Sequence, residues 1–179
     1  MSMSNSRNVF VVHGRSLRAR DAMFEFLKAL GLNPMDWNQA IRSTGRTIVH
    51  ISDILTSAFS EAQAIVVLFT GDDEGRLRKR FQSKNDPEYE IKKTPQPRLN
   101  VVFEAGMAFG YCPERTVLVQ IGKKMRPFSD ISGIHVIHFT DTRENRELLR
   151  DQLKQAGCPI SPRKDWLTAG DFSRPVHEE

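Results

Sequence analysis

The 179-residue sequence has few of the features that mark secreted, membrane-spanning or zinc-binding proteins. No apolar run reaches the length that crosses a bilayer, and the polar start MSMSNSR has no apolar signal core. Cysteine is rare: Cys112 and Cys158 are the two present, and neither belongs to a CxxC pair. The five histidines have no zinc-ligand spacing. We therefore expect a cytoplasmic protein with free thiols, no metal and no membrane partner.

The sequence also has no large excess of positive or negative side chains. The sequence has 26 Lys and Arg interspersed with 22 Asp and Glu, for a net charge of +4. Such mixing is typical of a solvated surface, and a site for an anionic small molecule is the second interpretation. A nucleic-acid partner is not expected, because the sequence has no C2H2 spacing, RNA-binding aromatic motif or long basic tail.

Strand-like and helix-like segments alternate along the chain. Apolar β-branched and aromatic runs predict five strands, at 8–14, 32–37, 64–70, 115–122 and 134–140. Apolar residues at helical spacing predict four helices, which begin near Ser16, Thr47, Leu99 and Thr142. This alternation predicts the α/β class, as a flavodoxin-like three-layer fold with a five-stranded parallel sheet of order 2-1-3-4-5.

Length and a hydrophobic content of 39% suit one domain with one core. We expect a flexible N-terminus over 1–7, a domain over 8–157, and a C-terminal tail over 158–179 packed on that domain. Two stretches have no periodicity. The polar residues 38–46 predict a loop, and the charged, proline-punctuated segment 71–97 predicts a surface insertion that is disordered over 78–96.

In sheets of this kind, ligands bind beyond the carboxyl ends of the strands, at the switch point between the first and third strands. The loops that meet there offer His13, Gly14 and Arg15, then Trp37, Thr44, Gly45 and Arg46, and finally Thr70, Gly71, Asp72 and Asp73. Arg15 and Arg46 suit a pyrophosphate, and Trp37 suits stacking on a flat ring. The alternative is a set of solvated arginines and a tryptophan packed at the end of a strand.

Glu104 is a single carboxylate within the apolar stretch RLNVVFEAGMAFG, residues 98–110. A carboxylate in a core segment is costly unless it is paired or used in chemistry. A helix would place Asn100 and Glu104 on one face, because they are four residues apart. Glu104 then pairs with Arg98 or Arg115, caps a loop amide, or is a carboxylate poised by partial burial beside the anion-binding rim.

A single carboxylate without metal ligands suits the cleavage of an N-glycosidic bond. The transition state of that reaction has oxocarbenium character, and a nearby carboxylate stabilises the positive charge or attacks the anomeric carbon. Glycosides need two carboxylates, whereas nicotinamide is already a good leaving group. The residues by themselves thus predict a nucleotide-binding α/β domain with one carboxylate at its site.

Four stretches together resemble the bacterial TIR-like predicted nucleotide-binding family, the TIR type of cyclic-nucleotide-signalled anti-phage effectors. They are NVFVVHGRS, GRTIV, AIVVLFTGDDEG and RLNVVFEAGMAFG. The resemblance runs from about Asn8 to Gly157, and the ending DWLTAGDF is also typical. It implies a TIR-like nucleotide-binding domain over 8–157 that, in active members, cleaves NAD⁺ to nicotinamide and an ADP-ribose product.

The resemblance also implies roles for individual residues. The glutamate of the family's NVxFExG motif matches Glu104, which is the implied catalytic residue. The implied substrate-binding residues are His13, Gly14, Arg15, Trp37, Gly45, Arg46, Thr70, Asp72, Asp73 and Asn100. Asp72 and Asp73 would bind ribose hydroxyls or cap a turn. NAD⁺ is the implied substrate, and no separate cofactor is expected.

Enzymes of this family often build the active site between neighbouring subunits. The resemblance therefore implies a homo-oligomer with an inter-subunit active site, switched on by self-assembly during antiviral defence. Family effectors are commonly fused to a sensor domain, for which the sequence has no room after residue 157. We expect that a separate sensor protein supplies the signal, that the sequence is a fragment of a sensor fusion, or that the protein acts alone.

Two other functions stay open. Nucleoside deoxyribosyltransferases carry an FExGxAxxxG-type helix with a nucleophilic glutamate, and FEAGMAFG is similar to it. A non-catalytic nucleotide-binding or scaffold module would use Glu104 as a structural partner and the segment 71–97 as a partner surface. The NAD⁺ glycohydrolase is the leading hypothesis, because the TIR-like match also includes the first strand.

Overall fold

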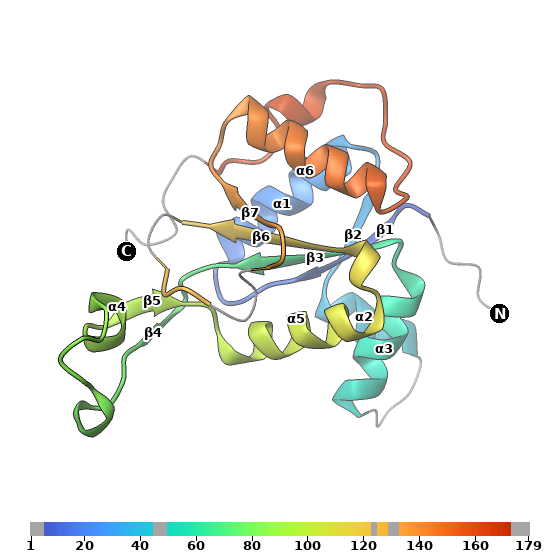
Figure 1. The fold of residues 1–179 in the computed structure, drawn as a ribbon. Helices are drawn as coiled ribbons and strands as arrows, with labels where there is room; N and C mark the ends of the chain where they lie inside the picture. Colours follow the sequence, from blue (N-terminus) through green and yellow to red (C-terminus); the bar gives the residue numbers. More distant parts are fainter. Residues whose placement is uncertain (1–5, 45–49, 123–124, 129–132, 173–179) are drawn as a thin grey trace.

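The computed structural model describes residues 6–44, 50–122, 125–128 and 133–172. Its centre is an all-parallel sheet of strand order β2-β1-β3-β6-β7 (Figure 1). The strands are β1 (Asn8–Val12), β2 (Asn33–Met35), β3 (Ala64–Phe69), β6 (Thr116–Ile121) and β7 (Val136–Phe139). These are the five predicted strands in the predicted order, so the flavodoxin-like α/β fold is confirmed.

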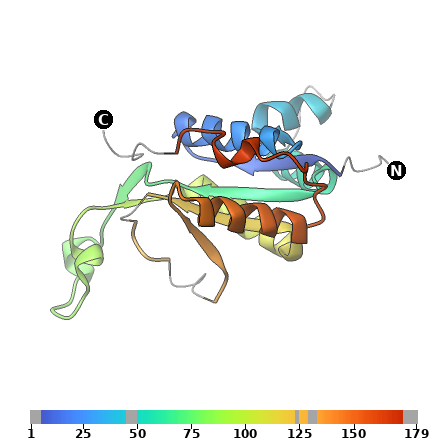
Figure 2. The ribbon, with the colours of Figure 1, turned by 90° about the horizontal axis from the view of Figure 1, so that it is seen from above.

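Helices cover both faces of this sheet and give the fold three layers (Figures 1 and 2). One face carries α1 (Leu17–Ala29) and α6 (Arg143–Gln155), and the other carries α2 (Trp37–Thr44), α3 (Ile51–Glu61) and α5 (Leu99–Tyr111). A sheet covered on both faces needs apolar residues on both, and all of β3 is accordingly buried. In the described ranges, no helix has the length and apolar character to cross a membrane.

The predicted polar loop over 38–46 is wrong in its described part, because α2 occupies it. Asp36 and Gln39 cap the start of this helix reciprocally. The Asp36 N–H donates to Gln39 Oε1, and the Gln39 N–H donates to Asp36 Oδ1, each at 3.1 Å. The same capping ends the neighbouring strand at Met35, two residues earlier than predicted.

The next helix also begins later than the sequence predicts. Thr47, its expected cap, lies outside the described residues, and α3 begins at Ile51 with His50 as its N-cap. Leu55 and Phe59 point into the core, with 0% and 1% exposure, whereas Ile51 is 64% exposed. The buried face of α3 therefore agrees with the predicted apolar spacing from Leu55 onward.

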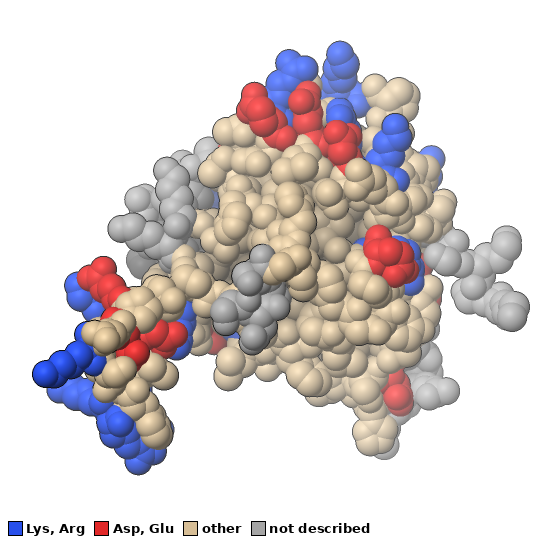
Figure 3. Space-filling model, in the orientation of Figure 1, with Lys and Arg blue, Asp and Glu red and all other residues tan. Residues whose placement is uncertain are grey.

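The predicted disorder over 78–96 is wrong. An antiparallel pair of short strands, β4 (Asp73–Gly75) and β5 (Thr94–Gln96), closes this segment, and between them lie a short 3-10 helix, η1 (Lys79–Phe81), and α4 (Glu88–Ile91). We call residues 73–97 the arm. It projects from the body in Figures 1 and 2, and Figure 3 shows Lys and Arg side chains at its outer end.

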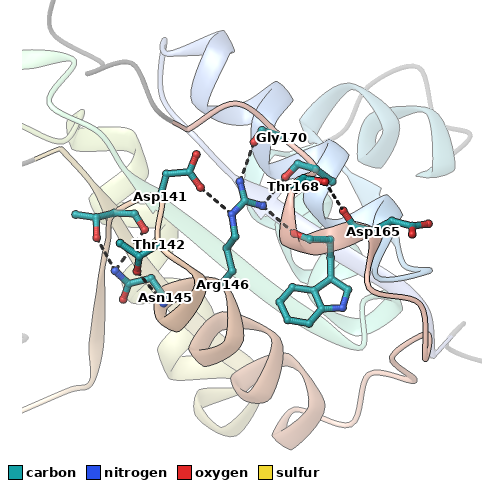
Figure 4. A network of polar contacts seen from close by, with 10 residues as sticks. Asp141, Thr142, Asn145, Arg146, Asp165, Thr168 and Gly170 are labelled. Atoms are coloured by element: carbon teal, nitrogen blue, oxygen red, sulfur yellow. Dashed lines mark hydrogen bonds and ion pairs between the residues drawn. The ribbon is translucent and has the colours of Figure 1, made fainter.

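The segment that follows α6 packs on the α1 side of the sheet, and a buried arginine joins it there (Figure 4). Arg146 is 3% exposed and pairs with Asp141 at 2.7 Å. Its guanidinium also donates to the carbonyl oxygens of Trp166, Ala169 and Gly170 at 2.8, 2.7 and 2.9 Å. These bonds satisfy a charge that would otherwise be costly to bury.

Candidate functional site

A pocket of about 490 Å³ lies at the carboxyl end of β1, where residues of α2, α3 and α5 approach it. This position is the switch point of the sheet, where β1 pairs with both β2 and β3. The predicted site residues that line it are His13, Gly14, Arg15, Trp37, Asn100 and Glu104. The fold thus brings together three separate parts of the sequence, each of which the switch-point rule or helical spacing had selected.

The helix α5 places Asn100 and Glu104 one turn apart on the pocket side. The adjoining side of the helix carries Val101, Ala105 and Ala108 into the core, and Val101 also lines the pocket, so this packing fixes the rotation of the helix. Arg98 is the N-cap residue, makes no side-chain cap bond, and also lines the pocket.

Glu104 is half-buried, and burial raises its pKa from the ordinary 4.5 to about 7. In the described ranges, no Lys, Arg or His side chain forms an ion pair with it. Arg115 instead donates to the Ala62 carbonyl oxygen at 2.6 Å and pairs with Glu114 at 3.5 Å. A carboxyl with this pKa has both protonation states near neutral pH, which suits general acid or base chemistry, and its ionised form can act as a nucleophile.

A hydrogen bond to the Asp72 side chain holds the loop after β1 in place. The Arg15 N–H donates to Asp72 Oδ2 at 2.6 Å. A Cβ at position 14 would lie 1.8 Å from the same oxygen, so Gly14 is needed for this close approach. Asp72 does not line the pocket, and it positions the loop that does.

Of the other predicted rim residues, Thr70 and Asp73 are described and do not line the pocket. Thr70 is 2% exposed, and its Oγ1 has no hydrogen-bond partner among the described residues. Asp73 belongs to β4, where it is paired with Gln96 of β5. Gly45 and Arg46 lie outside the described residues.

His13 is one of the residues that line the pocket. Its Nδ1 lies 2.9 Å from the Gly14 carbonyl oxygen, which can only accept, so this bond requires a proton on Nδ1. The neutral ring then has Nε2 as an acceptor. In the part of the chain that the structure describes, no three His, Cys, Asp or Glu side chains gather as a metal site would need.

Sequence reasoning missed the apolar walls of the pocket. Phe10 and Leu55 line it with 1% and 0% exposure and are part of the core, while Ile51 and Phe103 line it with 64% exposure each. Phe103 gave no signal, because α5 is apolar nearly all round in sequence and no exposed side stands out. Ile51 was missed because its helical spacing predicted a buried position.

The fold and this pocket define a flavodoxin-like α/β domain with one desolvated carboxylate at its switch point, which is the architecture predicted for a TIR-like domain. The chain belongs to the family described as CAP12/Pycsar effector protein, TIR domain, which matches residues 8–141. It is also similar to Protein tirC of Dictyostelium discoideum, with 28% identity over 156 residues that cover 82% of this chain and 73% of that protein. The family resemblance in the sequence is confirmed.

Proposed function

We propose that this TIR domain is an NAD⁺ glycohydrolase that acts as an effector in bacterial anti-phage defence. The observation that carries the proposal is Glu104, a carboxyl with a pKa of about 7 in a pocket of about 490 Å³. A structural carboxylate would have a cationic partner or a hydrogen-bond donor, and among the described residues Glu104 forms no ion pair and accepts no hydrogen bond. Family membership supports the class of protein, and the substrate is our inference.

The lining of the pocket suits a dinucleotide. Arg15 and Arg98 offer two guanidinium groups to a pyrophosphate. Trp37 and Phe103 offer flat apolar surfaces to the nicotinamide or adenine ring. The Asn100 amide can donate and accept, as recognition of ribose hydroxyls requires.

The proposed reaction breaks the bond between the ribose C1′ and the nicotinamide nitrogen. The electron pair of that bond goes to the nicotinamide ring, which loses its positive charge as the ribose gains one. The Glu104 carboxylate stabilises that charge or attacks C1′, and a water molecule then adds at C1′ and releases one proton. The products are nicotinamide, ADP-ribose and H⁺. Bound cationic nicotinamide favours the ionised form of Glu104, because opposite charges lower the pKa of a carboxyl.

Self-assembly is part of this proposal. Ile51 and Phe103 line the pocket and are each 64% exposed, and Leu99 is 73% exposed one turn before Phe103 on α5. A second copy seated on these side chains would bury apolar area and exclude water from Glu104, which strengthens electrostatic catalysis. We therefore expect activity to rise more steeply than protein concentration.

The test is nicotinamide release from NAD⁺, followed by chromatography over a series of protein concentrations. Wild type should release nicotinamide cooperatively, and Glu104→Gln should lose at least about a hundredfold in rate. Glu25→Gln is the matched control, because Glu25 is an exposed residue of α1 outside the pocket. Equal rates for wild type and Glu104→Gln would contradict the proposal. Exchange of one nucleobase for another on a deoxyribose, without nicotinamide release, would favour the deoxyribosyltransferase-like alternative.

A further inference from the structure

The arm has a stable base and a projecting end. The strands β4 and β5 pair at its base, and the Leu77 N–H donates to the Glu90 carbonyl oxygen at 2.8 Å across its two sides. Residues 76–84, which we call the tip, lie between these two sides. The tip itself is ordered by the Phe81 N–H, which donates to the Arg78 carbonyl oxygen at 2.8 Å, and by Gln82 Nε2, which donates to the Leu77 carbonyl oxygen at 2.8 Å.

Four acidic side chains of the arm have partners other than the cations of the tip. Glu74 pairs with Lys93 at 3.4 Å, Glu88 pairs with Lys92, and Glu90 pairs with Arg126 of the body. Asp86 accepts from the backbone N–H and the hydroxyl of Ser83, at 2.7 and 3.1 Å. None of these carboxylates therefore forms an ion pair with a cation of the tip.

The tip itself carries five cationic side chains. They are exposed, and in the described chain none forms an ion pair: Arg76, Arg78, Lys79, Arg80 and Lys84. Phe81 stands among them with 61% exposure, and the Arg80 guanidinium lies over its ring at 4.7 Å from the centroid. Figure 3 shows the resulting concentration of positive charge at the outer end of the arm, although the whole chain carries a net charge of only +4.

The shape of the tip selects among anionic partners. A site for single-stranded nucleic acid needs a groove that follows the backbone of the strand. The tip instead lies on the arm that projects from the body (Figures 1 and 2), and none of its residues lines any of four well-formed cavities of the described chain. An exposed aromatic ring among cations on a projecting turn matches a flat anionic surface, where the ring takes the interfacial level and the cations meet the headgroups.

We propose that the tip docks this protein on an anionic lipid bilayer, with Phe81 at the headgroup level and the five surrounding cations against the lipid charges. The absence of a membrane partner was predicted from the length of apolar runs, which bears on spanning a bilayer and not on contact with its surface. Ordering of the tip before contact lowers the entropy cost of docking. The proposal concerns a different part of the molecule from Glu104 and does not depend on the proposed reaction.

The test is co-flotation of the full chain with vesicles of phosphatidylcholine that contain no or about 30 mol% phosphatidylserine. We expect binding to the anionic vesicles alone, with a marked loss when salt rises from about 0.05 M to about 0.3 M. Each cation contributes roughly fivefold to binding, so the triple substitution Arg78→Glu, Lys79→Glu and Arg80→Glu should weaken binding more than a hundredfold. Phe81→Ala should weaken binding at both salt concentrations.

The matched control reverses three exposed charges elsewhere, by Lys154→Glu, Arg163→Glu and Lys164→Glu, and should retain most of the binding. Far-ultraviolet circular dichroism checks that each variant is folded, and Phe81→Ala tests the tip even if the triple variant does not fold. Equal binding to neutral vesicles, or equal losses for the tip and control triples, would overturn the proposal. So would tighter, tip-dependent binding of a single-stranded oligonucleotide or an acidic peptide than of anionic vesicles.

Discussion

Asp72 holds the backbone of Arg15 in place, because its Oδ2 accepts a hydrogen bond from the Arg15 N–H at 2.6 Å. The two residues are 57 positions apart, at the ends of neighbouring strands β3 and β1. This bond joins the loops at the switch point and sets the wall of the pocket next to His13. Asp72 thus supports the pocket from outside its lining.

Gly14→Ala should disturb this relationship directly. The new Cβ would lie 1.8 Å from Asp72 Oδ2, so the carboxylate must move and its bond to Arg15 must break. We expect a loss of about 1–3 kcal/mol in the free energy of unfolding, measured by urea denaturation. The control is a double-mutant cycle with Asp72→Ala, in which the cost of Gly14→Ala should shrink because the clash is gone. Strictly additive costs would contradict the assigned contact.

The raised pKa of Glu104 predicts a pH-dependent stability. Between its ordinary pKa of 4.5 and about 7, the folded protein binds more protons at this site than the unfolded chain does. Stability therefore falls as pH rises through this window, and the ionised carboxylate is destabilising above it. Glu104→Gln removes the titrating group, so it should stabilise the fold by about 1–2 kcal/mol at about pH 8, once partial solvation is allowed for.

At about pH 5 the same substitution should change stability little, since Glu104 is then largely neutral in the fold. Urea denaturation at the two pH values measures both effects, with Glu25→Gln as the exposed control that shows no such difference. A Glu104→Gln protein that is less stable than wild type at both pH values would show that Glu104 has a structural partner.

The buried hydrogen bonds from Arg146 to the segment after α6 predict that this segment is essential to the fold. Arg146→Met leaves the Asp141 carboxylate and three carbonyl oxygens without their donor, and we expect a loss of about 3–5 kcal/mol in the free energy of unfolding. Limited proteolysis should then cleave within 165–172. The control is Arg143→Met on the same helix, where the guanidinium is exposed and pairs with Glu147 of that helix at 2.9 Å. Similar losses for the two variants would contradict the special role of Arg146.

Local sequence patterns predicted the sheet because each strand and most helices carry their own periodicity. They failed where order comes from side-chain bonds, as in the reciprocal caps of Asp36 and Gln39 that start α2. DWNQ does have the spacing of a capping box, so that helix was detectable. Arg146 was detectable too, because it shares the apolar face of Leu149 and Leu153 at intervals of three and seven.

The part of the candidate site that the strand order determines was predictable from the sequence. The switch-point rule selects His13, Gly14 and Arg15, because the carboxyl ends of parallel strands meet at one edge. The rule cannot distinguish lining from support, so Asp72 was selected with them although it acts from behind the loop. The arm shows the same limit, since the sequence gives its charges but not which of them are paired.

The exposed ring of Phe103 predicts how assembly and activity are linked. If a second copy covers this side chain at the pocket mouth, Phe103→Asp should lower specific activity about tenfold or more at high protein concentration. At low concentration its effect should be small. A direct contact of Phe103 with substrate would instead give the same loss at every concentration. Phe81→Asp in lipid-free buffer is the matched control, because Phe81 is 61% exposed against 64% for Phe103 and lies on the distant arm. Nicotinamide release and sedimentation measured on the same samples distinguish the two outcomes, and equal behaviour of both variants would contradict closure of the pocket by a second copy.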